Sequence, residues 1–234
     1  MTHVNNIIDN IPIYYINLNR SLDRKTKIEQ TFLENNLKFK RVEGVDGKEL
    51  NIEELKKEYN INPKLNVGEI GCALSHMKII KEVLNDELEY ALIMEDDCNF
   101  DYVKYKKMKL TDIMKINNDW DIIQLAMIND KNTFTKISNT NQILEKSNFV
   151  VAGAMGYLIN KKGIQKILAD FNKNKHIEVS EVLLFKNSNT YLAKPYFSYY
   201  SYKEVSSTIR ENTKSAFTTQ RLSKIWWDEY YEKN

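Results

Sequence analysis

The sequence predicts an α/β fold in which helices flank a mostly parallel central sheet. Short apolar runs rich in Ile, Tyr and Val recur along the chain, and segments with helical periodicity separate them. Strands that alternate with helices in this way build parallel sheets. A chain of 234 residues, 42% hydrophobic and 28% charged, can also bury a large core. Collagen-like, low-complexity and disordered chains are therefore excluded.

The first half of the chain supplies three expected strands and three expected helices. In chain order they are a strand at 11–18, a helix from 21, a strand at 38–42, a helix from 51, a helix at 69–84 and a strand at 90–94. Ser21 can cap the first helix, and Ile28, Phe32 and Leu33 are expected on its inner face. Asn51 begins a capping-box pattern.

The second half is expected to add strands at 121–126 and 149–159 and a helix at 161–171. Residues 130–148 are polar and lack periodicity, which predicts a surface excursion. Aromatic residues at 191–202 either stack on sugars or, as we favour, form a strand with one face in the core. The whole chain, 1–234, is expected to be one domain, with a C-terminal extension from about residue 203.

Charge and cysteine content narrow the class further. Lys and Arg total 34 against 32 Asp and Glu, a net charge of +2, which gives no support for nucleic-acid binding. Cys72 and Cys98 belong to no CxxC pair, so a disulfide scaffold or zinc ribbon is not expected. The longest apolar run is too short to cross a membrane, and residues 1–10 lack a secretory signal. We therefore expect a cytoplasmic protein.

Three consecutive acids, Glu95, Asp96 and Asp97, directly follow the expected strand at 90–94. In open α/β sheets, ligands bind beyond the carboxyl ends of the strands. Adjacent carboxylates repel one another unless a cation lies among them, and a hard divalent metal that also contacts diphosphate oxygens meets this need. The alternative is a solvated acidic turn.

Two further segments carry candidate binding residues. Glu69, Cys72 and His76 share one side of the expected helix. This side is a ligand-binding surface, a set of hydrogen-bonded residues at the edge of the core, or a zinc site that lacks a fourth ligand. Arg20 and Arg24 flank a helix N-terminus, where they contact phosphate or lie on the surface. Neither a G-x-G-x-x-G nor a P-loop motif is present, which excludes those nucleotide-binding classes.

Seven blocks of sequence together resemble a known family. In chain order they are YINLNR (15–20) with D-R (23–24), VDG (45–47), GEIGCALSH (68–76), LIMEDD (92–97), WDIIQL (120–125), GAMGYLI (153–159) and SSTI (206–209). The chain resembles glycosyltransferase family 25, the lipooligosaccharide and collagen β-galactosyltransferase family, over about residues 11–210. The GEIGCALSH and EDD blocks are the specific ones, and the others support them.

The resemblance implies a GT-A-like nucleotide-sugar-binding fold, a UDP-sugar donor (most often UDP-galactose) and a Mn²⁺ or Mg²⁺ ion. It places Glu95 and Asp97 at the metal, with Asp97 as the first choice of direct ligand. The donor-binding residues that it implies are Asn17, Arg20, Arg24, Asp46, Glu69, His76, Asp96 and Gly153.

One departure concerns the acceptor side. The family usually carries Pro-Val-Asp-Glu there, whereas this chain has Glu178-Val179-Ser180-Glu181, with Ser180 in the Asp position. Family membership implies inversion at the anomeric carbon, so a base must take the acceptor proton. A serine hydroxyl cannot do this. The apolar run that follows favours a helix here, and we expect Glu181 to be the base, with Glu178 second.

The expected partners are a nucleotide sugar and a glycan or glycolipid acceptor of the lipooligosaccharide type. A protein hydroxylysine acceptor, or a non-catalytic nucleotide-sugar-binding scaffold that has lost its base, are the alternatives. A receiver-type phosphoacceptor domain is disfavoured, because its paired acids lie near the N-terminus of a shorter chain. Trp226, Trp227, Tyr230 and Tyr231 near the C-terminus pack against the domain, or touch the inner membrane face peripherally.

Overall fold

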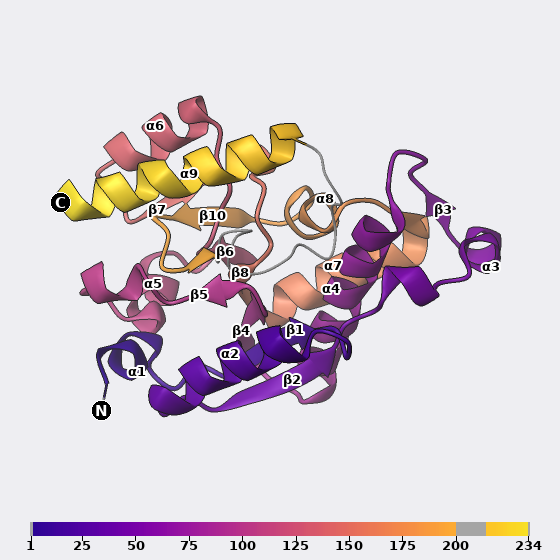
Figure 1. Ribbon diagram of the computed structural model, residues 1–234, viewed down its shortest axis with the longest axis horizontal. Coiled ribbons are helices and arrows are strands. Elements are labelled where there is room, and N and C mark those ends of the chain that lie inside the picture. The colour runs from indigo at the N-terminus through magenta and orange to yellow at the C-terminus, as the bar shows by residue number, and fades with distance from the viewer. Residues whose placement is uncertain (1, 200–213, 234) are drawn as a thin grey trace.

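The computed structural model describes residues 2–199 and 214–233 (Figure 1). The SSTI block at 206–209 and the aromatic residues Tyr200 and Tyr202 therefore lie outside the described residues. The nine helices of the described part are α1 (His3–Ile8), α2 (Leu22–Glu34), α3 (Ile52–Glu58), α4 (Val67–Asn85), α5 (Leu110–Ile116), α6 (Lys131–Asn139), α7 (Lys161–Asn174), α8 (Ser180–Phe185) and α9 (Lys214–Lys233). Two 3-10 turns, η1 (Gly47–Glu49) and η2 (Val103–Tyr105), complete the helical elements.

A seven-stranded sheet forms the centre of the molecule, in the order β2-β1-β4-β8-β6-β10-β7. Its strands are β1 (Ile13–Asn17), β2 (Phe39–Glu43), β4 (Tyr90–Glu95), β6 (Ile122–Gln124), β7 (Leu144–Lys146), β8 (Gly156–Asn160) and β10 (Thr190–Ala193). Two small sheets pair β3 (Asn60–Ile61) with β9 (His176–Ile177), and β5 (Cys98–Asn99) with β11 (Ser198–Tyr199).

The α/β class is confirmed, and the sheet is mixed. Strands β1, β2 and β4 are parallel, as are β6 and β10, whereas β8 runs antiparallel to both β4 and β6, and β7 to β10. Five strands therefore share one direction and two oppose it. The apolar run that forms β8 carries no signal for direction, which is why the sequence did not reveal the reversal.

Helices cover both faces of this sheet. In β4, Leu92 and Met94 belong to the core cluster that contains residues of α1, α2 and α5, whereas Ala91 and Ile93 belong to the cluster under α4, α7 and α8. Alternate residues of a strand point to opposite faces, so a strand buried on both sides is continuously apolar. This is the pattern on which the strand at 90–94 was predicted.

The segment 149–159 was expected to be one strand, and only its last four residues are, as part of β8. Gln124 Nε2 donates to the carbonyl oxygens of Val151, Ala152 and Gly153, at 3.2, 3.3 and 2.8 Å. A buried side chain thus satisfies carbonyl oxygens in this segment, where a strand would use a sheet ladder. The ladder begins at Gly156.

Two other expectations are corrected. Residues 130–148 contain α6 and the edge strand β7, because Asp130 caps the helix by accepting from the Thr133 backbone N–H at 2.8 Å. Leu33 is 67% exposed, because Ile28 and Phe32 define the buried face of α2 and Leu33 lies about 100° beyond it. The expected core role of the aromatic run holds for its described members: Tyr191, Tyr196, Phe197 and Tyr199 are buried.

The aromatic C-terminal segment packs on the domain. Helix α9 lies beside α6 (Figure 1), and Trp227, 1% exposed, and Tyr231 join a core cluster with Tyr102, Met127 and Leu192. Trp226 contacts Phe134 and Lys131 on the same side. Among the described residues, no helix has the length and apolar character needed to cross a membrane.

Candidate functional site

A cleft of about 280 Å³ lies at the carboxyl ends of β1 and β4. The loop after β1, the first turns of α2, the turn around η1, the N-terminal part of α4 and the end of β4 form its walls. Seven residues predicted from the sequence line it: Asn17, Arg20, Arg24, Asp46, His76, Glu95 and Asp96. These side chains come from parts of the chain as distant as residues 17 and 96, and the sheet order β2-β1-β4 brings them together.

Helix α4 approaches the η1 turn through glycines. A Cβ atom on Gly71 would lie 2.6 Å from the Val45 carbonyl oxygen and 2.7 Å from the Gly47 nitrogen. Real Cβ atoms do not come so close to backbone atoms, so only glycine fits. The close approach expected of the GEIGC segment is thus to another backbone. The approach fixes Asp46, the N-cap residue of η1, opposite the Arg20 guanidinium with which it pairs.

Asp96 is buried, and polar partners surround its carboxylate. Asn17 Nδ2 donates to one oxygen at 2.7 Å, and Arg24 pairs with the other. Burial raises the pKa of Asp96, while Arg24 opposes that rise. Asp96 therefore positions Arg24 and Asn17 within the cleft.

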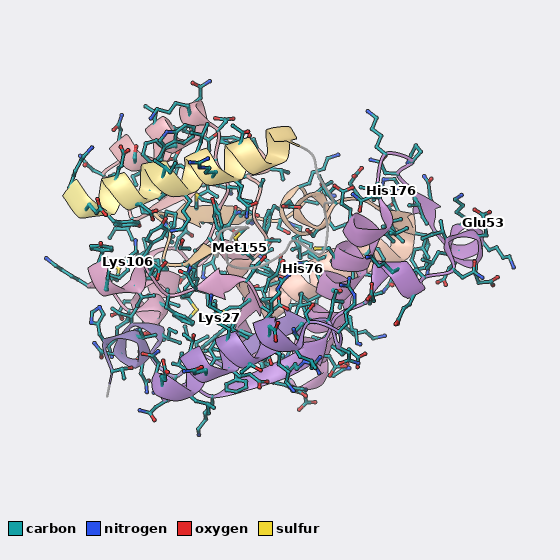
Figure 2. All side chains as sticks on the ribbon, in the orientation of Figure 1. Lys27, Glu53, His76, Lys106, Met155 and His176 are labelled. Atoms are coloured by element: carbon teal, nitrogen blue, oxygen red, sulfur yellow. The ribbon has the colours of Figure 1, made fainter. Side chains whose placement is uncertain are left out.

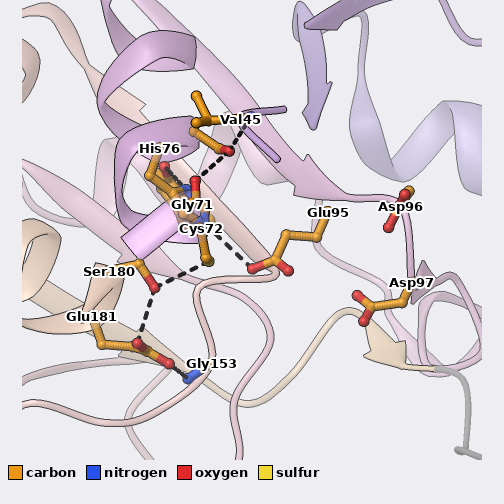
Figure 3. Close-up of polar contacts among 12 residues, drawn as sticks. Val45, Gly71, Cys72, His76, Glu95, Asp96, Asp97, Gly153, Ser180 and Glu181 are labelled. Carbon is orange, nitrogen blue, oxygen red and sulfur yellow. Dashed lines mark hydrogen bonds and ion pairs between the residues drawn. The ribbon is translucent and has the colours of Figure 1, made fainter. Parts of the chain in front are cut away.

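Asp97 has a different environment. Its Oδ2 lies 3.4 Å from Arg24, and its Oδ1 is buried without a hydrogen-bond partner among the described residues. Figure 3 shows the Asp97 carboxylate directed to the side on which Glu95 lies, whereas Asp96 lies apart. Burial raises the pKa of Asp97 to about 7, Arg24 opposes the rise, and Glu95 and Asp96 add to it. An orphaned carboxylate oxygen beside a second carboxylate suits a divalent cation.

His76 and Cys72 lie on the other side of Glu95. The His76 ring is fully buried, with Nδ1 3.0 Å from the Tyr157 hydroxyl and Nε2 3.3 Å from Glu95 Oε1. Potential ligand atoms of Cys72, His76 and Glu95 all lie within 4.8 Å of one another. The structure therefore groups Glu95, in place of Glu69, with the two α4 residues.

Two predicted donor-binding residues and one predicted metal ligand do not line the cleft as described: Glu69, Gly153 and Asp97. Glu69 closes a capping box with Asn66, in which its carboxylate accepts from the Asn66 backbone N–H at 3.0 Å. Its place near the donor stays a prediction.

The two candidate bases are held in separate places. Glu181 is in the first turn of α8, as the helical interpretation expects, and its carboxylate accepts from the Gly153 backbone N–H at 3.1 Å and the Ser180 hydroxyl at 3.0 Å. Ser180 in turn accepts from the Cys72 thiol at 3.6 Å. Glu178 precedes the helix and accepts from Asn62 Nδ2 at 2.6 Å, beside β3. Figure 3 shows Glu181 on the Cys72 side of the cleft, to which Ser180 links it.

Gly153 holds this contact because of its backbone. Its φ of +108° is one that side-chain-bearing residues rarely adopt, and a Cβ there would lie 2.9 Å from the Met127 Cα. Gly153 thus contributes through its N–H to Glu181, a role that sequence analysis did not assign.

Sequence analysis also missed Tyr157, Ser75 and Lys48. The Tyr157 hydroxyl reaches His76 only because β8 lies next to β4, a pairing that no local signal gives. Ser75 lines the cleft and accepts from the Val45 N–H at 2.8 Å, and Lys48 lines the same wall. Ser75 lies within the GEIGCALSH block and Lys48 directly follows the VDG block, so these two blocks could have indicated both residues.

Comparison with known proteins identifies the family of the chain. A family model described as "Glycosyltransferase family 25 (LPS biosynthesis protein)" matches residues 10–183. Procollagen galactosyltransferase 2 of Mus musculus is 33% identical over 214 residues, covering 85% of this chain and 34% of that protein. The Homo sapiens protein of that name is 35% identical over 186 residues, covering 73% and 29%.

These matches define a class, the glycosyltransferases, and within it a family. The chain belongs to glycosyltransferase family 25. It spans about a third of the length of the curated relatives it matches. Among solved structures, a glycosyltransferase involved in the glycosylation of the major capsid of PBCV-1 shows 10% identity and a TM-score of 0.39, covering 70% of this chain and 66% of that one.

Proposed function

We propose that this chain is a metal-dependent inverting glycosyltransferase that moves a hexose, galactose by preference, from a UDP-sugar to an acceptor hydroxyl. One observation carries the proposal. Within the family-matched segment, a single cleft gathers two arginines, a buried amide and the acids that end β4. Arginines recognise phosphate, and carboxylates hold the cation that a diphosphate leaving group requires.

The donor diphosphate is proposed to lie between Arg20, Arg24 and the end of β4. Glu95 and Asp97 would hold Mn²⁺ or Mg²⁺, since Asp97 Oδ1 is buried without another partner in the described part of the chain. Such an ion would neutralise charge on the departing UDP, so that no acid would be needed for departure. Asp96 keeps Arg24 directed into the cleft, and buried His76 fixes Glu95 from behind.

Glu181 is proposed to act as the general base. The acceptor oxygen bonds to the anomeric carbon, the bond to the UDP oxygen breaks, and the acceptor proton passes to the Glu181 carboxylate. Gly153 and Ser180 hold that carboxylate in place by donating to it. Ser180, in the position where an Asp is usual, thus supports the neighbouring acid, which argues against the non-catalytic scaffold alternative.

Two acceptor classes fit the comparisons. The family description names LPS biosynthesis, which supports a lipooligosaccharide-type glycan. Similarity to procollagen galactosyltransferases over 85% of the chain supports a protein hydroxyl, as on hydroxylysine. Assays with both acceptor types and UDP-galactose or UDP-glucose decide between them.

The matched pair Glu181→Gln and Glu178→Gln tests the mechanism. We expect Glu181→Gln to lower transfer by at least ~100-fold, the usual scale for a general base, with UDP binding retained. Glu178→Gln should transfer at a rate close to wild type, because Glu178 faces Asn62. UDP release with and without acceptor is the measurement. The reverse ranking would move the base to Glu178, and no effect of either variant would remove this segment from the mechanism.

A further inference from the structure

A second cavity, of about 530 Å³, lies where α9 ends. Figure 2 shows Lys106, one of its residues, well separated from His76 in the donor cleft. Segments distant in sequence form it: η2 with the two lysines that follow, Lys194 after β10, the last turns of α9, and His3. A cavity of this size accommodates a small ligand or headgroup.

This cavity is lined by four lysines and, among the described residues, by no acid. The four are Lys104, Lys106, Lys107 and Lys194. In the described part of the chain, none of them has a carboxylate within ion-pair distance, whereas Lys109 and Lys224 pair with Asp9 and Asp228. Four like charges that converge without a counter-ion repel one another, and an anion relieves the repulsion.

Neutral groups hold the inner ammonium groups in place. Lys106 Nζ donates to the Lys194 carbonyl oxygen at 2.9 Å and to the Tyr231 hydroxyl at 2.5 Å, and it lies 4.5 Å from the Tyr196 ring centroid. Lys194 Nζ donates to the Tyr230 hydroxyl at 2.7 Å. Cation–π contacts and hydroxyls orient these cations without neutralising them. Burial and nearby Lys194 lower the pKa of Lys106 to about 7, so a bound anion would favour its charged form.

We propose that this cavity binds a phosphate group, at a site distinct from the donor cleft and independent of the proposed activity. A phosphate carries more than one negative charge, which matches several lysines better than one carboxylate does. Tyr105, 39% exposed, stacks on Tyr231 at a centroid distance of 5.3 Å and offers an aromatic wall for the group that carries the phosphate. The phosphate can belong to a free small molecule or to a lipid headgroup.

Calorimetric titration of the full chain with pyrophosphate tests the proposal. EDTA is present, so that a metal-assisted diphosphate site in the donor cleft does not contribute. We expect the double variant Lys104→Gln/Lys107→Gln to weaken binding at least ~10-fold, because the loss of even one charge-assisted contact has about that effect. Both side chains are exposed, so folding should be unaffected. Lys64→Gln/Lys81→Gln, also exposed, is the control with the same change in net charge.

A second arm uses sedimentation with phosphatidylcholine vesicles, with and without phosphatidic acid, to detect a lipid source. Binding in either arm that depends on Lys104 and Lys107 supports the site. Equal weakening in the Lys64/Lys81 control would show non-specific charge attraction and overturn it. Absence of binding to both probes, or pyrophosphate binding lost in Arg20→Gln but kept in Lys104→Gln/Lys107→Gln, would overturn it as well.

Discussion

Three consecutive carboxylates at the end of β4 meet three different environments. Arg24 and Asn17 surround Asp96, and buried His76 contacts Glu95. Asp97 keeps one oxygen without a partner among the residues that the structure describes. The mutual repulsion expected of adjacent acids is thus relieved at Asp96 by a cation of the chain itself. Arg24 also lies near Asp97, but burial outweighs that contact, and burial together with the neighbouring Glu95 and Asp96 raises the pKa of Asp97 to about 7.

The raised pKa of Asp97 predicts how metal-free stability depends on pH. Its folded-state pKa, about 7, exceeds the ordinary value of 3.8, so the folded protein holds this proton more tightly than the unfolded chain. Stability therefore falls as the pH rises from about 4 through 7. We expect Asp97→Asn in EDTA to melt at least ~2 °C above wild type at pH 8, a small effect because the side chain is 31% exposed.

Differential scanning calorimetry from pH 8 down to pH 4 measures this difference. The advantage of Asp97→Asn should shrink as the pH falls, because Asp97 then becomes protonated in the wild type. A variant less stable than wild type at pH 8, or a difference that ignores pH, would show that the Arg24 contact with Asp97 outweighs its burial.

At this scale, sequence reasoning located the acids and the arginines but not their individual partners. Asn17 ends β1, and Arg20 and Asp46 follow β1 and β2. They line the cleft because the carboxyl ends of parallel strands meet at one edge of the sheet. Helical spacing predicted that Glu69 lies beside Cys72 and His76, because all three share one side of α4. In the structure Glu69 instead closes the capping box of α4, and Glu95 is the acid next to Cys72 and His76. The contact between Glu95, at the end of β4, and His76 of α4 joins residues distant in sequence, which no local pattern reveals.

The contact between α4 and η1 is the element that shapes the cleft. Because a Cβ on Gly71 would collide with two backbone atoms, Gly71→Ala must push the helix from the turn. We expect a loss of about 1–3 kcal/mol in the free energy of unfolding, the range for overpacked sites, together with weaker UDP binding. Urea denaturation and calorimetry measure the two effects.

Lys81→Ala is the matched control, since Lys81 is exposed on the same helix and lies outside the cleft. It should leave both quantities within experimental error of wild type. If Gly71→Ala were equally silent, the glycine contact would not determine the position of α4.

Elements with strong periodicity were predictable, and those stabilised by distant side chains were not. For α4 and α7, the apolar residues that face the core and the residues that cap the helix are close together in the sequence, so they can be recognised there. The loop at 149–155 instead depends on Gln124, some 27 residues earlier in the chain, whose amide takes up its carbonyls. Helix α6 contributes only Ile137 to the fully buried core, and α9 supplies the partner of its apolar face.

At the scale of the whole molecule, α9 completes a core cluster to which Tyr102, just before η2, and Leu192 of β10 also belong. Trp227 is 1% exposed, and its Nε1 donates to Asn129 Oδ1 at 2.8 Å. We expect Trp227→Ala to lower the free energy of unfolding by about 3–5 kcal/mol. The melting temperature should then fall by at least ~6 °C, in a single transition.

Trp226→Ala is the companion variant, because Trp226 is only half-buried over Lys131 and Phe134. Its effect should be a fraction of that of Trp227→Ala. A melting transition unchanged by Trp227→Ala would show that α9 folds independently of the rest of the chain.

UDP together with Mn²⁺ is the ligand expected to connect the arginine side and the acidic side of the cleft. A ligand that binds only the folded protein stabilises it, by about 2.7 kcal/mol at 100 times its dissociation constant. For a chain of this size, UDP with Mn²⁺ should therefore raise the melting temperature by ~5–10 °C. UDP with EDTA should give a much smaller shift, and Asp97→Asn should abolish the part that depends on Mn²⁺. Glu181→Gln should keep the full shift, because Glu181 lies with Ser180 and Gly153 on the acceptor side. A shift that is identical with EDTA would contradict metal-assisted donor binding, and a shift lost in Glu181→Gln would place that residue at the donor.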